Sequence, residues 1–264
     1  MNYFQELIYE ICSENGISFE LISKEWIIKL NKNGIYKYIA GTKMPLNSET
    51  TFLLCRDKYA TYEVMKTAGI PIVEHRLIYS TKHVKNYESD LKNTKEFREY
   101  LDKYKKLIIK NTCGSMGEDV YIAEDINKLR SNLRRVFKRN DTAVISPFMN
   151  IEAEYRVICL DNEVELIFEK VRNENSWKHN LCQGARAQIV ENMDLKEKLT
   201  RFALQVMKVL DARFASVDLI LVDGALMVLE VNSSVCMSYF AEQVEGGREI
   251  AKKIYEKAIK KMYE

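Results

Sequence analysis

Hydrophobic residues along the chain change repeatedly between the spacing of an amphipathic helix and the spacing of a strand. Apolar residues three and four positions apart predict helices over 3–14, 57–68, the second half of 82–106, 126–137, 195–210 and 245 to the end. Alternating or continuous apolar runs predict strands over 17–22, 36–39, 71–79, 107–110, 142–149, 154–160 and 163–170. Because helices are interleaved with antiparallel hairpins, the pattern predicts the α+β class, in more than one lobe.

The stretch FASVDLILVDGALMVLEVNSS near the carboxyl end predicts a β-hairpin that turns at an Asp-Gly pair. Three oxygen-bearing side chains interrupt its apolar pattern: Asp218, Glu230 and Asn232. A carboxylate in the middle of an apolar strand is unfavourable unless a charge or a metal offsets its loss of water. Two carboxylates and an amide oxygen would suit Mg²⁺, a hard ion that prefers oxygen ligands.

A shared metal requires these three side chains to lie on one face of the hairpin. A two-residue turn would place Asp218 opposite Leu229, so that Asp218 and Glu230 would point to opposite faces. An odd-numbered loop or a β-bulge would bring them onto one face, because a shift of one residue flips every side chain. Glu230 and Asn232 share a face in any register. The alternative is an amphipathic hairpin with Asp218 at a strand end and Glu230 in solvent.

The composition is that of an ordinary globular protein, with 47% hydrophobic and 30% charged residues among 264. A net charge of +2 gives no reason to expect a nucleic-acid partner. The six cysteines are scattered without zinc-binding spacing, which favours a reducing cytoplasm. The first helical segment carries acids within its apolar face, unlike a signal peptide, and no apolar run approaches membrane-spanning length. We therefore expect a cytoplasmic protein without a membrane partner.

A lysine followed by a glycine-bearing turn forms the second candidate site. Lys110 ends a predicted strand, and the turn after it contains Gly114, Ser115 and Gly117. The backbone amides of such a turn can close over phosphate oxygens, with the lysine as a positive charge. Neither the Walker A nor the Rossmann glycine pattern is present. An ordinary hairpin turn with a solvated lysine is the alternative interpretation.

A third segment is rich in hydrogen-bond donors and carries too few acids to neutralise them: Arg172, Lys178, Asn180 and Arg186. Positive groups near a metal–phosphate site would stabilise charge that develops during phosphoryl transfer. The alternative is a polar loop packed by Trp177.

Taken in order along the chain, these segments resemble the ATP-grasp superfamily. The matching segments are RDKYATYEVMKTAGIPI, IIKNTCGSMGEDVYIA, VISPFMNIEAEYRVICL and DLILVDGALMVLEVNSS. The EVNSS sequence and the D-K…G-I-P opening are similar to ribosomal-protein glutamate ligases. The R-x4-W-x2-N spacing is similar to lysine-biosynthesis ligases that act on a carrier protein, and IYKYIAGTKMPLNSET is similar to a segment of cyanophycin synthetase.

This resemblance implies an ATP-grasp fold of two α+β lobes that grip ATP, with a short N-terminal α/β segment. The implied domains are a truncated N-terminal segment, an N-terminal or lid subdomain, and a C-terminal subdomain with the metal site: 1–56, 57–146 and 147–264. Assembly into a homo-oligomer is also implied.

The resemblance also assigns roles to individual residues. ATP would be bound through phosphate contacts, the adenine edge and the ribose by Lys58, Lys110, Gly114, Ser115, Gly117, Pro147, Phe148, Glu154, Lys178, His179 and Asn180. The backbone of Pro147 and Phe148 would meet adenine, and Glu154 the ribose. Arg172 and Arg186 would act in catalysis. Two Mg²⁺ ions, replaceable by Mn²⁺, would be held by Asp218, Glu230 and Asn232.

The implied reaction joins a carboxylate to an amine. ATP would phosphorylate the carboxylate, and the amine would attack the acyl phosphate, giving an amide, ADP and phosphate. The partners would be a small-molecule acid and an amino acid or peptide, with the amine either free or borne by a carrier protein or protein tail. A non-catalytic nucleotide-binding or carrier-binding module is the alternative.

The chain departs from the family pattern at four places. Ser146-Pro147 stands at the hinge where Gln-Glu or Glu-Glu is usual, and Asn111 replaces a proline. Val235-Cys236 replaces the Pro-Gly that usually follows the metal segment. The segment before the ATP-grasp region is also short, about fifty residues. The short segment and the altered hinge motivate the non-catalytic alternative.

Overall fold

The structure, a computed structural model, describes residues 1–80, 94–114, 119–174 and 176–264. Ser115 and Gly117 of the predicted phosphate turn lie outside the described residues. The chain divides into two compact units, Met1–Phe52 with Ala153–Leu219 and Val231–Glu264, and Leu53–Glu152 with Ile220–Glu230. Both units combine helices with antiparallel strands, which confirms the α+β class. The three domains predicted from the sequence stay a prediction.

The first unit has a small N-terminal sheet, a larger sheet and helices packed on both. Its elements are α1 (Tyr3–Glu14), β1 (Ser18–Ile22), β2 (Ile27–Lys32), β3 (Ile35–Ala40), β8 (Ala153–Leu160), β9 (Glu163–Val171), the 3₁₀ turn η2 (Leu181–Gln183), β10 (Arg186–Ile189), α6 (Met193–Val209), most of β11 (Phe214–Val222), α7 (Ser238–Gln243) and α8 (Gly247–Met262). The hairpin end of β11 and most of β12 (Ala225–Asn232) fall within Ile220–Glu230, which belongs to the second unit. The small sheet has the strand order β1-β2-β3, and the larger sheet has the order β10-β9-β8-β11-β12.

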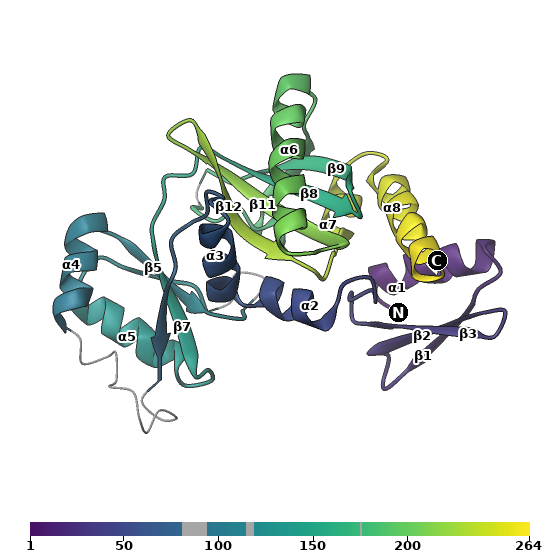
Figure 1. Ribbon diagram of the computed structural model, residues 1–264, viewed down its shortest axis with the longest axis horizontal. Helices are drawn as coiled ribbons and strands as arrows, with labels where there is room; N and C mark the ends of the chain where they lie inside the picture. Colours follow the sequence, from purple (N-terminus) through teal and green to yellow (C-terminus); the bar gives the residue numbers. More distant parts are fainter. Residues whose placement is uncertain (81–93, 115–118, 175) are drawn as a thin grey trace. The chain divides into compact units, whose positions relative to one another are not determined.

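α1 begins at a reciprocal cap. The Asn2 side chain accepts a hydrogen bond from the Gln5 backbone N–H at 3.0 Å, and the Gln5 side chain accepts one from the Asn2 N–H at 2.8 Å. These bonds satisfy two N–H groups that the first turn leaves without partners. Leu7 and Ile11 on the apolar face of α1 join a core with α8, which lies beside it (Figure 1), and with the small sheet.

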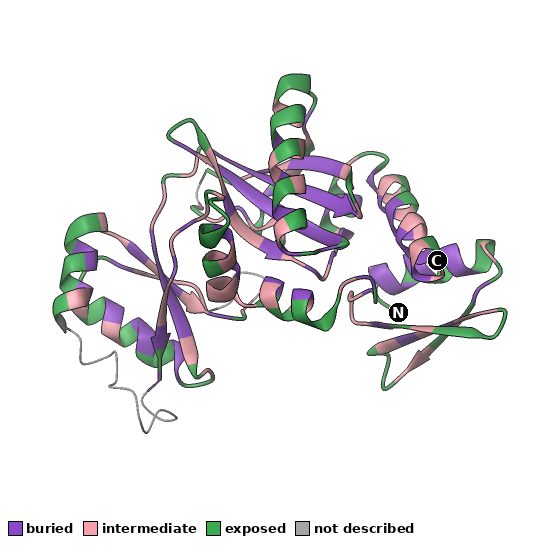
Figure 2. Ribbon diagram, viewed as in Figure 1, coloured by how far each residue is buried: buried purple, intermediate pink, exposed green. Residues whose placement is uncertain are grey.

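The two faces of the larger sheet have different partners. α6 lies across one face, over β8 and β9 (Figure 1). On the other face, Ile158, Phe168 and Phe214 join the core that α7 and α8 complete. Figure 2 shows β8 and β9 largely buried as a result. Since side chains alternate along a strand, the face of that core also carries four charged residues: Glu154, Arg156, Lys170 and Asp218.

The outer edge of β10 is covered by one side chain. Gln243, the last residue of α7, accepts a hydrogen bond from the Ala187 backbone N–H at 2.9 Å and donates one to the Ala185 carbonyl at 3.3 Å. The side-chain amide therefore makes the two bonds that a neighbouring strand would otherwise make.

The second unit is built on a four-stranded sheet. Its elements are α3 (Lys58–Thr67), β4 (Arg76–Tyr79), α4 (Thr94–Tyr104), β5 (Leu107–Asn111), β6 (Tyr121–Ala123), α5 (Ile126–Val136) and β7 (Thr142–Pro147), and α2 (Glu49–Arg56) contains the chain boundary between the units. The strand order is β4-β7-β5-β6. α3 and α5 begin at Asp57 and Asp125, whose carboxylates each accept two hydrogen bonds from the first turn, as the sequence predicts for α5.

One face of the four-stranded sheet forms the core of the second unit. Ile109, Ala143 and Ile145 pack there with Leu129 and Leu133 of α5. α4 and α5 both lie on this side of the sheet (Figure 1). The opposite face carries the alternate residues of the same strands, among them the buried Val144 and Ser146 of β7.

None of the helices within the described residues is both long enough and apolar enough to cross a membrane.

Tyr255 fixes the loop that follows β12. Its hydroxyl accepts a hydrogen bond from the Met237 backbone N–H at 2.9 Å and donates one to the Val235 carbonyl at 3.3 Å. Tyr255, Val235 and Met237 are all buried. Tyr255 of α8 therefore orders this loop, in which Val235-Cys236 replaces the Pro-Gly pair of the family pattern.

Replacing Tyr255 by phenylalanine should destabilise the protein by about 1–3 kcal/mol, because two buried backbone groups lose their partner. The free energy of unfolding in urea measures the effect. Tyr263 is the matched control, since its hydroxyl is buried and has no hydrogen-bond partner within the described residues. Tyr263→Phe should leave the free energy unchanged or raise it, and equal losses in the two variants would contradict the assignment.

Candidate functional site

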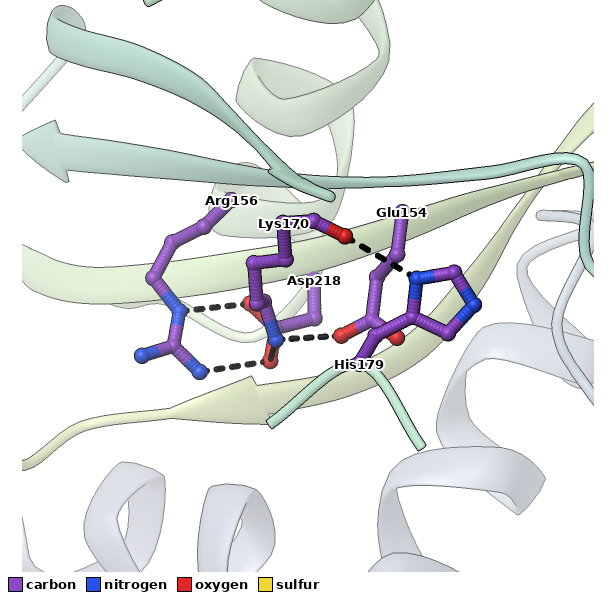
Figure 3. Close-up of polar contacts among 5 residues, drawn as sticks. All are labelled: Glu154, Arg156, Lys170, His179 and Asp218. Carbon is purple, nitrogen blue, oxygen red and sulfur yellow. Dashed lines mark hydrogen bonds and ion pairs between the residues drawn. The ribbon is translucent and has the colours of Figure 1, made fainter. Parts of the chain in front are cut away.

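Asp218 is the central residue of the candidate site. It lies in the middle of β11 with 0% of its surface exposed. Arg156 on β8 donates to both carboxylate oxygens, from Nε to Oδ1 at 2.7 Å and from Nη2 to Oδ2 at 2.7 Å (Figure 3). This bidentate pairing is the strongest geometry that arginine offers a carboxylate.

Lys170 on β9 joins Asp218 to a second acid. Its ammonium donates to Asp218 Oδ2 at 2.9 Å and also to Glu154 Oε1 (Figure 3). Lys170 and Glu154 are 3% and 5% exposed, so neither charge is exposed to bulk water. Two acids and two bases therefore alternate in one buried network, and their formal charges cancel.

The network determines the charge state of Asp218. Burial alone would raise the pKa of this carboxyl, since a low-dielectric interior disfavours the anion. The charges of Arg156 and Lys170, and the hydrogen bonds that both donate, outweigh burial and hold the pKa well below its usual range. Asp218 is thus an anion at neutral pH, as a metal ligand must be.

His179 extends the network on the side of Glu154. Its Nδ1 lies 3.0 Å from the backbone carbonyl of Lys170, and a carbonyl can only accept, so Nδ1 carries the hydrogen. Nε2 is buried and has no hydrogen-bond partner within the described residues. In Figure 3 this nitrogen points away from Asp218. The ring therefore presents a polar atom that a ligand could satisfy.

The remaining cationic candidates of the first unit lie outside the network. Arg172 and Arg186 are exposed, the latter on β10 opposite Val171. Lys178 lies over the Trp177 ring, 5.6 Å from its centroid. Their predicted roles, like that of Asn180 before η2, stay predictions.

The structure does not establish that the predicted metal ligands, Asp218, Glu230 and Asn232, lie on one face of the hairpin. Asp223 and Gly224 both have positive φ, 50° and 73°, which is the conformation of a two-residue hairpin turn. Convergence of Asp218 and Glu230 therefore requires a bulge within β11 or β12. Within the described residues, no three His, Cys, Asp or Glu side chains gather to hold a metal. The predicted set has only two acids and an amide, so the metal site stays a prediction.

Lys58 is linked to the candidate phosphate turn. It is the first residue of α3, and its backbone N–H donates to the Thr112 carbonyl at 3.1 Å. Its ammonium donates to the Gly114 carbonyl. The Asn111 side chain accepts from the Cys113 N–H at 3.1 Å, so Asn111 orders the start of the turn where the family has a proline.

Part of the backbone at the predicted hinge contacts, Pro147 and Phe148, already has a partner, and the contacts with adenine stay a prediction. The Phe148 N–H donates to the Lys106 carbonyl at 2.9 Å, and Pro147 has no N–H. Phe148 therefore cannot donate to a base from its backbone while that bond is present.

Sequence reasoning missed Arg156 and Lys170 as site residues. The available signals were an arginine two positions after Glu154 and a lysine inside the apolar strand LIFEKV. A charge within a buried strand needs a partner, which is the argument that identified Asp218.

Comparisons with solved structures identify the fold. D-alanine–D-alanine ligase from Bacillus anthracis, solved with ATP, matches with a TM-score of 0.59 at 20% identity, over 81% of this chain and 69% of that chain. The ATP-grasp ligase PsnB, solved with its minimal precursor, matches with a TM-score of 0.56 at 16% identity, over 80% and 64% of the two chains. These likenesses show the ATP-grasp fold.

The chain belongs to the family of RimK-like ATP-grasp domains, whose model matches residues 55–258. Tetrahydromethanopterin:alpha-L-glutamate ligase of Methanocaldococcus jannaschii is 29% identical over 61% of this chain. A probable alpha-L-glutamate ligase of Haemophilus ducreyi is 26% identical over 75% of it. The matches span only 55% and 61% of the lengths of these two relatives.

Replacing Lys170 by methionine should destabilise the protein by about 3–5 kcal/mol, because Glu154 would remain buried without a cation. Chemical denaturation at neutral pH measures the loss.

The matched control is Lys29→Met. Lys29 pairs with Glu20 on the exposed face of the small sheet, at 2.8 Å. An exposed pair contributes little, so this variant should keep the wild-type midpoint. If Lys170→Met also kept the midpoint, the buried network would not hold the sheet together.

Proposed function

We propose that the chain is an ATP- and Mg²⁺-dependent ligase that joins a carboxylate to an amine. The observation that carries this proposal is the buried, ionised Asp218 on an apolar strand of a RimK-like ATP-grasp domain. The substrate carboxylate attacks the γ-phosphorus of ATP and ADP leaves. The amine then attacks the acyl carbon, phosphate leaves, and the amine nitrogen loses a proton. The protein would contribute positioning and charge stabilisation to both steps, and Mg²⁺ would supply further positive charge.

In this proposal, the phosphates, the base and the ribose of ATP each have their own contacts. Lys58 and Lys110 contact phosphates in this proposal, and the bond from Lys58 to Gly114 ties one lysine to the glycine turn. At the base, the Pro147 carbonyl accepts from the adenine amino group. Met149 donates its N–H to the ring, since the Phe148 N–H is bonded to Lys106. Glu154 contacts the ribose.

The Asp218 carboxylate suits a metal through one oxygen. Among the described residues, Oδ2 accepts from both Arg156 and Lys170, whereas Oδ1 accepts only from Arg156 and keeps a second lone pair. Mg²⁺ bound there, with Glu230 and Asn232, would neutralise charge on the transferring phosphate. Two ions, and Mn²⁺ as a substitute, belong to the same proposal.

A bulge in β12 is part of the metal proposal. The two most buried residues of this strand, Val228 and Val231, are three positions apart, at 0% and 1% exposure. A regular strand buries residues an even number apart on one face, and a bulge shifts the alternation by one. Such a shift would carry Glu230 and Asn232 onto the face of Asp218.

The substrates are amino-acid or peptide compounds in this proposal. The relatives are named for L-glutamate, and another PsnB structure, at 15% identity, is described as a complex with the precursor peptide PsnA2. The amine is free or borne by a protein. Arg172 and Arg186 are exposed and available to a substrate carboxylate. Assembly into a homo-oligomer in the cytoplasm completes the proposal.

The proposal predicts phosphate release from ATP that depends on both an added acid and an added amine. The screen pairs amino acids, dipeptides and aromatic acids with L-glutamate and other amines, and mass spectrometry identifies the amide. Glu230→Gln should lower turnover about a hundredfold or more, because a metal ligand loses its charge. The control is Glu245→Gln, at an exposed position after α7, which should leave turnover unchanged.

Glu230 is preferred to Asp218 for this test because Asp218 also stabilises the fold. ATP binding without product for every pair of substrates would favour the non-catalytic nucleotide-binding module instead.

A further inference from the structure

The exposed surface of α5 carries positive charge at its carboxyl end. From residue 124 to 141 the chain has six basic and three acidic residues, a local net charge of +3, whereas the whole chain has +2. α5 has exposed positions from its first turn to its last (Figure 2). Four exposed cations lie at its end and just beyond it, and we call them the α5 patch: Arg134, Arg135, Lys138 and Arg139. Within the described residues, none of the four forms an ion pair.

The four cations lie close together on successive turns of the backbone. Arg134 and Lys138 are four residues apart, as are Arg135 and Arg139, and residues at this spacing are neighbours on a helical surface. The helical path continues beyond α5, since the Lys138 backbone N–H donates to the Arg135 carbonyl at 3.2 Å. Arg135 also lies over the Tyr121 ring of β6, 5.7 Å from its centroid. The α5 patch is therefore one compact cationic surface on the second unit.

The basic helix α8 differs from α5 in how its charge is balanced. The last turn of α8 also carries two cations, Lys260 and Lys261. Lys260 pairs with Glu256 at 2.8 Å, and Lys261 pairs with Glu264 at 2.6 Å. The two cations in the last turn of α5 have no such acids within the part of the chain that the structure describes. The sequence thus places acids beside one basic helix end and leaves them out beside the other.

The helix dipole accounts for only part of this charge. A cation in the last turn is favoured by the negative end of the dipole, which explains Arg134 and Arg135. Lys138 and Arg139 then add like charges at the spacing where charges repel. Arginine guanidinium groups bind carboxylates in a bidentate geometry. Because the α5 patch has no internal ion pairs to break, it can form such bonds with an incoming anion.

The size of the α5 patch fits a short acidic segment of a protein. Six residues of helix extend over about 7.5 Å, a length that roughly three residues of extended chain cover. A nucleic acid would need a basic surface that continues along its backbone, and this chain has nearly as many acids as bases, 38 against 40. We propose that the α5 patch docks a short run of Asp and Glu residues on a partner protein. Docking there does not depend on the proposed ligase reaction.

The test measures binding of a fluorescent deca-glutamate peptide, blocked at both ends, by fluorescence anisotropy without nucleotide. The wild-type protein should bind the peptide at low salt and lose affinity as salt is added. Arg134→Gln combined with Arg135→Gln should weaken binding about tenfold, since two exposed ion pairs each contribute modestly. Arg134→Lys combined with Arg135→Lys should keep most of the affinity, because it keeps both charges. Lys260→Gln combined with Lys261→Gln is the matched control and should change the affinity less than about twofold, because those lysines already have acids.

Failure of the wild-type protein to bind the peptide, or unchanged binding after the two arginines become glutamine, would overturn the inference. Equal losses in the α5 and α8 glutamine variants would indicate a general effect of net charge and would overturn it as well. A single-stranded DNA decamer is the competing probe. If it bound more tightly than the peptide and lost affinity in the same α5 variant, the patch would be a nucleic-acid site instead. All of these outcomes leave the proposed ligase intact, because the measurement contains no ATP.

Discussion

The architecture of the first unit depends on how it satisfies one buried carboxylate. Asp218 is enclosed by β-sheet, and an anion in such a place is tolerated only with opposite charges at hydrogen-bond distance. Arg156 supplies one charge from β8, the neighbour of β11, and Lys170 supplies the other from β9, the strand beyond β8. Three strands must therefore keep one register. The same contacts keep the carboxylate ionised, and among the described residues they use three of its four lone pairs. The residues that stabilise the sheet therefore also prepare Asp218 for its proposed role.

Much of the fold follows from local sequence. The helix over Tyr3–Glu14 and the hairpin of β8 and β9 were predicted nearly to the residue, because each has strong periodicity and a clear cap or turn. β2, α2, β10 and α7 were not predicted. β10 and α7 have only four and six residues, too few to establish a period, and β2 (IIKLNK) ends in polar residues. Such short elements form because neighbours pair with them.

The candidate site was only partly predictable, for a reason visible in one hairpin. Leu160 pairs with Glu163 at the turn, and unbroken pairing from there would set Glu154 opposite Glu169. A bulge at Glu165 shifts the register, so that Tyr155 pairs with Glu169 and Glu154 meets Lys170. Neither the composition nor the spacing of residues in the sequence predicts the bulge at Glu165. Asp218 could be found from the sequence because it breaks an apolar strand, whereas its partners depend on register.

The Gln243 amide at the edge of β10 has a consequence for self-association. A bare strand edge invites another chain to add to it, which is a common route to aggregation and fibrils. Here the N–H of Ala187 and the carbonyl of Ala185 are already bonded, so an incoming strand would have to displace a helix-borne side chain first. At the β10 edge, a single glutamine thus opposes the addition of a strand from another copy of the chain.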